Sequence, residues 1–146
     1  MSRIAATDHL DACDGDVPVL PDLDALFARY ATRYMAGDAG AVADLYGAPC
    51  LAIRSGAVIP LADRSAVVEH LEGLMAAYRA AGAAMANIMS IEVLPQGDAA
   101  LLATVHWDIR TASGSLVRDF RTSYQLAGDV GWRIVSYVNH DFIGLA

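Results

Sequence analysis

The spacing of apolar residues changes at Gly82, and this change constrains the fold more than any other feature of the sequence. Before Gly82, apolar side chains recur at steps of three and four residues, which is typical of amphipathic helices. After Gly82 they alternate with polar ones, which is typical of strands. The alternating stretches are residues 85–94, 99–110, 115–126 and 132–141, with short segments rich in Gly, Asp and Ser between them. Because these connections are too short for crossovers, the sequence predicts an antiparallel meander of long strands.

The residues before Gly82 predict three helices and a short hairpin. The first helix begins near Pro21, ends at Gly37 and carries an apolar stripe of Leu23, Leu26, Phe27, Tyr30 and Tyr34. Asp38 is suited to cap a second helix that includes Val42, Leu45 and Tyr46. Asp63 is suited to cap a third helix that ends at Gly82 and carries an apolar stripe of Val67, Leu71, Leu74, Met75 and Tyr78. Between these two helices, the apolar runs 50–54 and 57–61 flank Ser55-Gly56, a pattern that predicts a hairpin.

Composition narrows the class of protein and its partners. The chain has 146 residues, of which 55% are hydrophobic, and we expect one domain at residues 21–146 after a flexible acidic tail at residues 1–20. A formal net charge of -7 is the wrong sign for binding nucleic acid. There is no apolar run long enough for a membrane span and no secretory signal, so we expect no membrane partner and a cytoplasmic location. Cys13 and Cys50 form no metal-binding pattern, and neither a metal nor another cofactor is expected.

The order of these elements resembles the nuclear transport factor 2-like (NTF2-like) superfamily. The resemblance covers about residues 22–141 and rests on this order and on the segments Tyr30 to Asp38, Leu45-Tyr46 and Gly131-Trp132-Arg133-Ile134. It implies an α+β fold, the cystatin-like α+β barrel, in which a cone-shaped curved antiparallel sheet wraps around a long helix beside two N-terminal helices. Superfamily members include SnoaL-like cyclases, ketosteroid isomerase, scytalone dehydratase and non-catalytic binding or assembly domains, so the fold alone does not assign a reaction.

The alternation divides the meander into an apolar face and a polar face. Ordinary amphipathicity would bury the apolar face under the helices. The resemblance implies the reverse, a concave pocket lined by last-strand residues that include Tyr137 and Asn139, with the convex face in contact with another subunit. We therefore expect a polar pocket for a small-molecule ligand. The expected homodimer forms through the apolar row of Trp107, Phe120, Tyr124, Trp132 and Ile134.

Three residues of the polar face are the candidate catalytic group. If Arg110 pairs with Ser115, His106 lies opposite Asp119, and a carboxylate bonded to one imidazole nitrogen would leave the other nitrogen to act as a base. Arg121 could stabilise a developing enolate. The alternative to a catalytic role is that these His, Asp and Arg side chains form a solvated cross-strand network, which contributes little to stability. A second alternative is a hydrolase like limonene epoxide hydrolase that uses Asp108, Asp119 and Arg121.

The expected ligand-binding residues are Tyr30, Arg54, Ser123, Tyr137 and Asn139. In an ungapped alignment on Ala36-Gly37-Asp38, the oxyanion-binding Tyr of ketosteroid isomerases falls on Tyr30. Their proton-shuttling carboxylate falls on Arg54, which cannot accept a proton, so their chemistry cannot be carried over. Cys50 is either a nucleophile near Arg54 or a small buried apolar residue. His70 and Glu69 are assigned to the surface.

Two classes of function follow from these residues. One is a cofactor-free enzyme resembling SnoaL-like isomerases and cyclases, which would bind or transform a small apolar or anionic carbonyl compound. The other is a non-catalytic module for ligand binding or dimerisation. The sequence leaves open whether the protein is an enzyme.

Overall fold

The first apolar stripe forms helix α1 (Leu23–Met35), as the sequence predicts. The computed structural model describes residues 20–128 and 131–141, so the acidic tail expected at residues 1–20 lies outside the described residues except for Leu20. The Asp22 side chain accepts a hydrogen bond of 3.1 Å from the backbone of Ala25, which satisfies an amide that the first turn leaves unpaired. Gly37, with a φ of 75°, follows the end of the helix in the left-handed conformation that glycine adopts without strain.

Helices α2 (Ala39–Ala43) and α3 (Arg64–Ala80) begin after the predicted caps Asp38 and Asp63. The prediction that α2 extends through Tyr46 is wrong. After α2, the backbone of Leu45 accepts a hydrogen bond from Ile134, and Tyr46 pairs with Ile134 as the first residue of a strand. Pairing with a distant strand therefore ends the helix earlier than the apolar pattern indicated.

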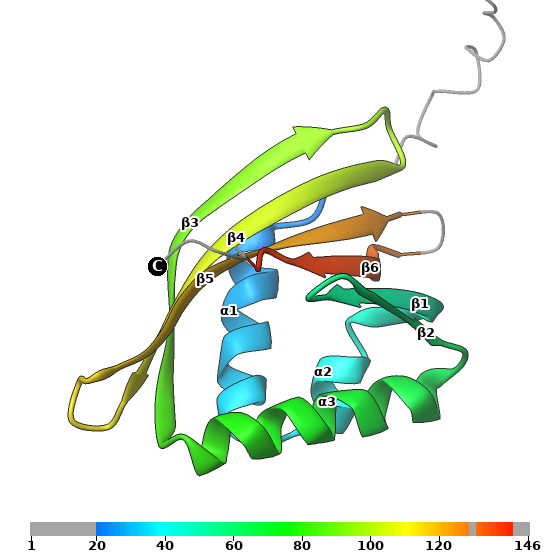
Figure 1. Ribbon diagram of the computed structural model, residues 1–146. Helices are drawn as coiled ribbons and strands as arrows, with labels where there is room; N and C mark the ends of the chain where they lie inside the picture. Colours follow the sequence, from blue (N-terminus) through cyan, green and yellow to red (C-terminus); the bar gives the residue numbers. More distant parts are fainter. Residues whose placement is uncertain (1–19, 129–130, 142–146) are drawn as a thin grey trace, which may run out of the picture.

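The strands form one six-stranded sheet in the order β2-β1-β6-β5-β4-β3. Their bounds are β1 (Tyr46–Arg54), β2 (Ala57–Leu61), β3 (Ala83–Pro95), β4 (Ala100–Thr111), β5 (Leu116–Ala127) and β6 (Arg133–Asn139). The hairpin β1–β2 and the antiparallel meander β3 to β6 are as predicted. The parallel pairing of β1 with β6 joins the two parts into one sheet. Figure 1 shows that this sheet curves without closing, which confirms the predicted α+β fold class.

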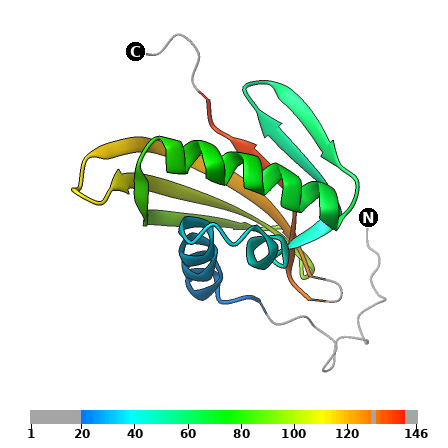
Figure 2. The same cartoon turned by 90° about the horizontal axis from the view of Figure 1, so that it is seen from below.

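All three helices lie on the concave side of the sheet. Figure 2 shows α3 lying over the strands, with α1 and α2 beside it. The core between these layers contains fully buried side chains from every layer, among them Phe27, Val42, Leu71, Leu101, Leu126 and Ile134. Among the described residues, no helix is long and apolar enough to span a membrane.

The sheet presents its apolar face to the helices, so the expected arrangement of faces is wrong for β4 and β5. Trp107, Tyr124 and Ile134, which were expected on the outside, are at most 4% exposed. Phe120 and Trp132, the other members of the expected dimer row, are partly buried and pack against the core. The polar residues of β4 and β5 lie on the convex side, which we call the outer face. The physical reason is the ordinary one for a half-buried sheet, because helices cover the face that gains most from leaving water.

Two registers differ from the expected ones. In β4 and β5, His106 pairs with Arg121 and Asp108 with Asp119, a shift of two residues that leaves each side chain on its face. In β5 and β6, the pairing is irregular between Gln125 and Leu126. This irregularity changes the alternation by one residue, so Ile134 faces the helices and so do Tyr137 and Asn139 further along.

Candidate functional site

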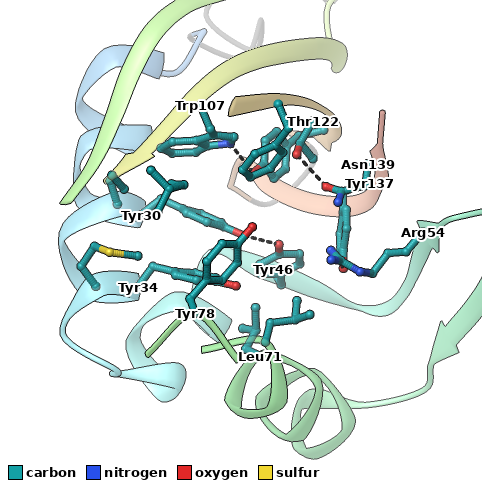
Figure 3. A pocket seen from close by; sticks show the side chains of 17 residues that line it. Tyr30, Tyr34, Tyr46, Arg54, Leu71, Tyr78, Trp107, Thr122, Tyr137 and Asn139 are labelled. Atoms are coloured by element: carbon teal, nitrogen blue, oxygen red, sulfur yellow. Dashed lines mark hydrogen bonds between the residues drawn. The ribbon is translucent and has the colours of Figure 1, made fainter. Parts of the chain in front are cut away.

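A hollow of about 510 Å³, including the part open to solvent, lies between the concave face and helices α1 and α3. All six tyrosines of the chain line it, and Trp107 and Phe120 add two more aromatic rings. Figure 3 shows these side chains converging from α1, α3 and the sheet. Arg54 is the only charged residue among the described residues that line the hollow. The site is therefore an aromatic cavity with one cation at its border.

Local structure explains how the tyrosines converge. Tyr30 and Tyr34 are four residues apart on α1, so they lie on one side of the helix, and their rings stack at 5.9 Å. Tyr124 of β5 and Tyr137 of β6 are a directly opposed cross-strand pair, with ring centroids 6.3 Å apart. Tyr78 of α3 contacts Tyr34 edge to face. Helical and cross-strand spacing together thus build the aromatic walls.

The deepest polar groups bond to one another. The hydroxyls of Tyr30 and Tyr46 are 2.7 Å apart, and the Trp107 indole donates to the Tyr124 hydroxyl at 3.1 Å. Burial raises the pKa of the Tyr30, Tyr46 and Tyr124 hydroxyls well above the ordinary value, so all three stay protonated. Tyr30 also hydrogen-bonds with Tyr124, so these hydroxyls satisfy one another in the wall of the hollow.

Arg54, Tyr137 and His70 form a chain of hydrogen bonds at the border of the hollow, which we call the Arg54 triad. The Arg54 guanidinium donates to the Tyr137 hydroxyl at 3.4 Å, and that hydroxyl is 2.7 Å from Nε2 of His70. Because guanidinium can only donate, the phenol oxygen accepts from Arg54. The direction of the bond between Tyr137 and His70 depends on the tautomer of the imidazole. In the tautomer with the proton on Nδ1, Nε2 of His70 accepts the proton of Tyr137.

The charges around the triad favour a neutral imidazole. Burial lowers the pKa of His70, and the positive charge of Arg54 lowers it further. Burial raises the pKa of Tyr137, although its bond with Arg54 opposes this shift. His70 was assigned to the surface from its position in the helix, but it is half-buried and touches a residue that lines the hollow.

A second arginine near the hollow, Arg118, has a carboxylate partner. Arg118 donates to the Tyr78 hydroxyl at 3.1 Å and to the carboxylate of Asp141 at 3.2 Å. The other oxygen of Asp141 accepts from the backbone of Ser55 at 2.7 Å. Arg54, by contrast, has no carboxylate within ion-pair distance in residues 20–128 and 131–141.

The predicted site residues separate into two groups. Four of them, Tyr30, Arg54, Tyr137 and Asn139, line the hollow. The other four, His106, Asp119, Arg121 and Ser123, lie on the outer face. There, His106 and Asp119 are hydrogen-bonded at 2.6 Å, and Ser123 bonds to Thr104 and His140. The catalytic role of His106, Asp119 and Arg121 stays a prediction, but the hollow is not where they meet.

Asp108 and Cys50, two further candidates for chemistry in the sequence, lie outside the hollow. Asp108 is on the outer face with Asp119 and Arg121, and Arg110 donates to its carboxylate at 2.8 Å. This bond lowers the pKa of Asp108, so the carboxylate is held as an anion. Cys50 is buried, and burial raises its thiol pKa to about 11, as expected for a small core residue and not for an activated nucleophile.

Sequence reasoning missed several residues of the hollow. Tyr34 and Tyr78 were placed on helix stripes as packing residues, and Trp107, Phe120 and Tyr124 were assigned to the outside. The helical spacing of Tyr34 and Tyr78 carried a usable signal, because both stripes had to face the sheet. The sequence around His70 carried no such signal, since only the tertiary fold brings this residue to Tyr137.

The comparisons with known proteins agree with this fold. A protein-family model for NTF2-like proteins, DUF6841, matches residues 21–142. No curated protein matches the chain. An NTF2-like protein with a cystatin-like fold from Novosphingobium aromaticivorans is 24% identical with a TM-score of 0.67, over 86% of this chain and 82% of that one.

Two other solved structures have the same fold. Aln2 from Streptomyces is 21% identical with a TM-score of 0.64, over 82% of this chain and 87% of that one. An NTF2-like protein of unknown function from Shewanella oneidensis is 16% identical with a TM-score of 0.64, over 82% of this chain and 97% of that one. The family model covers most of the chain, and the chain therefore belongs to the NTF2-like family DUF6841.

Proposed function

We propose that the protein binds a small aromatic anion in the hollow, with the ring among the tyrosines and the negatively charged oxygen at Arg54. The observation that carries this proposal is the environment of Arg54. Its guanidinium is half-buried at the border of an aromatic cavity and has no carboxylate partner among the described residues. A partly desolvated cation without a counter-ion is stabilised by an anionic ligand.

The shape and chemistry of the hollow support a ligand of this class. Ligand sites in proteins are concave and mostly apolar, with a few polar groups that orient the ligand, and the hollow has this character. Aromatic walls favour a planar ring through offset stacking and edge contacts. The Tyr137 hydroxyl and the Asn139 amide supply further polar groups beside Arg54. The ligand class is close to the small anionic carbonyl compound expected from the resemblance to SnoaL-like proteins.

Titration calorimetry with 3-phenylpropanoate tests the proposal, with the neutral 3-phenylpropanamide as the matched ligand. We expect the anion to bind at least about tenfold more tightly than the amide, since a charge-assisted hydrogen bond contributes about 1.5–3 kcal/mol. In Arg54→Gln this preference should disappear. Arg29→Gln, at an exposed position of α1, is the control and should keep it.

Two outcomes would contradict the proposal. One is that neither probe binds the wild-type protein. The other is that Arg54→Gln keeps the preference for the anion as fully as Arg29→Gln does, which would place the anion site elsewhere.

A further inference from the structure

The Arg54 triad has one feature that ligand binding does not require. An arginine and a tyrosine suffice to hold an anion, but here the phenol also contacts a neutral imidazole on its far side, at 2.7 Å. His70 does not line the hollow, so it reaches a ligand only through Tyr137. The hydroxyl is thus the link between the hollow and a half-buried histidine.

We propose that His70 and Tyr137 form a proton relay that removes a proton from a ligand acidified by an adjacent carbonyl group. This inference rests on the proposed function, because the ligand must first bind beside Arg54. The relay uses the tautomer of His70 with the proton on Nδ1, in which Tyr137 donates to Nε2. The phenol oxygen has two lone pairs, and Arg54 uses one of them. The second lone pair is available to a ligand that lies in the hollow.

The proton transfer balances without any other reactant. The C–H bond of the ligand breaks, and its electron pair is delocalised onto the carbonyl oxygen as an enolate. The Tyr137 oxygen takes the proton while its own proton moves to Nε2 of His70, so one O–H bond and one N–H bond form as one C–H and one O–H bond break. The products are an imidazolium and an enolate. Arg54, which was already the anion partner, stabilises the enolate.

The charges around His70 favour transfer of the proton from Tyr137 to the imidazole. The imidazole starts neutral because burial and Arg54 lower its pKa. Arg54 of β1 and Tyr137 of β6 are the charged and titratable groups that act on it across the packed elements, among the described residues. The half-exposed imidazole can return its proton to water, and reversal of the relay then delivers a proton from solvent to the ligand.

Deuterium exchange of phenylpyruvate in D₂O, followed by NMR, tests the relay. This probe carries an aromatic ring, a carboxylate and a methylene group next to a ketone. We expect the wild-type protein to exchange the methylene protons roughly a hundredfold faster than the protein-free solution, at the lower end of acid–base catalysis. In His70→Gln the rate should fall to the protein-free value, because an amide can accept the Tyr137 hydrogen bond but cannot take the proton.

The pH profile separates a relay from a merely structural role. In the wild-type protein the exchange rate should fall as the pH is lowered through the His70 pKa, because the imidazolium can no longer accept a proton. His140→Gln, on the outer face, is the control and should keep both the rate and the profile. Tyr137→Phe should lose exchange, since it removes the group that touches the ligand.

Binding of 3-phenylpropanoate, which has no ketone, distinguishes the possible failures. If His70→Gln binds this probe as the wild type does but no longer exchanges phenylpyruvate, the relay is supported. If His70→Gln exchanges at the wild-type rate, or if the wild type binds both compounds without exchange, the relay is wrong and the proposed function stands. If neither compound binds, both are wrong.

Discussion

His106 and Trp107 are neighbours on β4, and their side chains lie on opposite faces of the sheet. The Trp107 ring is 4% exposed and packs near Tyr30, with its indole bonded to Tyr124. The His106 side chain is 20% exposed, and its partner Asp119 is 50% exposed. One residue step along a strand therefore separates a core position from a surface pair.

Alanine substitutions at these two positions should differ in their effect on stability. We expect Trp107→Ala to lower the free energy of unfolding by about 3–5 kcal/mol, because it removes a buried ring and leaves a cavity. His106→Ala should cost less than about 1 kcal/mol, since its hydrogen bond to Asp119 lies at the surface and contributes little. Urea unfolding followed by circular dichroism measures both. Equal losses would contradict the assignment of the two faces.

At the scale of elements, the side chain of Asp63 caps the start of helix α3. Asp63 accepts a hydrogen bond from the backbone of Ala66 at 2.9 Å, and α3 then carries Tyr78 to the hollow and His70 to Tyr137. We expect Asp63→Ala to cost about 1 kcal/mol and lower the melting temperature by about 4 °C. Glu69→Ala, an exposed carboxylate in the same helix, is the control in a thermal scan and should change stability by less than about 0.5 kcal/mol. An equal effect of the two would mean that the charge matters and the cap does not.

Such local signals explain why most of the elements could be predicted from the sequence. A helix cap such as Asp38 or Asp63 acts on amides within three residues, and Ser55-Gly56 closes a hairpin by its own backbone preferences. Strand register could not be predicted in the same way. The irregularity beside Gln125 follows from how β5 and β6 meet in the folded sheet, and it decides that Tyr137 faces the helices.

Because strand register depends on the folded sheet, the sequence also predicts the site only in part. Tyr30, Arg54, Tyr137 and Asn139 were all found through the resemblance, the last two because it implies a pocket lined by alternate residues of the last strand. The catalytic group was placed on the polar face because polar residues suggest chemistry. The apolar face lines the hollow instead. The polar groups at its border come from β1, α3 and β6, and β6 is far from the other two in the sequence.

At the scale of the whole molecule, the predicted homodimer stays a prediction, but the surface for it changes. The apolar row that was expected to form it packs inside the protomer, with three of its five residues at most 4% exposed. The outer face has no described helix over it (Figure 1). This face still carries exposed apolar side chains from three strands, Leu94, Leu116 and Val138. The expectation that the convex face meets another subunit is therefore kept, with different residues.

Multi-angle light scattering at tens of micromolar tests this surface. We expect the wild-type chain to have the mass of a dimer, and Val138→Glu to have the mass of a monomer, because it would bury a charge without a partner in the contact. Val93→Glu is the matched control, since Val93 is 45% exposed and pairs with the buried Ala103, on the side of the sheet opposite to the outer face. This variant should remain dimeric. A monomeric wild type would contradict the dimer, and a dimer that survives Val138→Glu but not Val93→Glu would place the contact on the other side of the sheet.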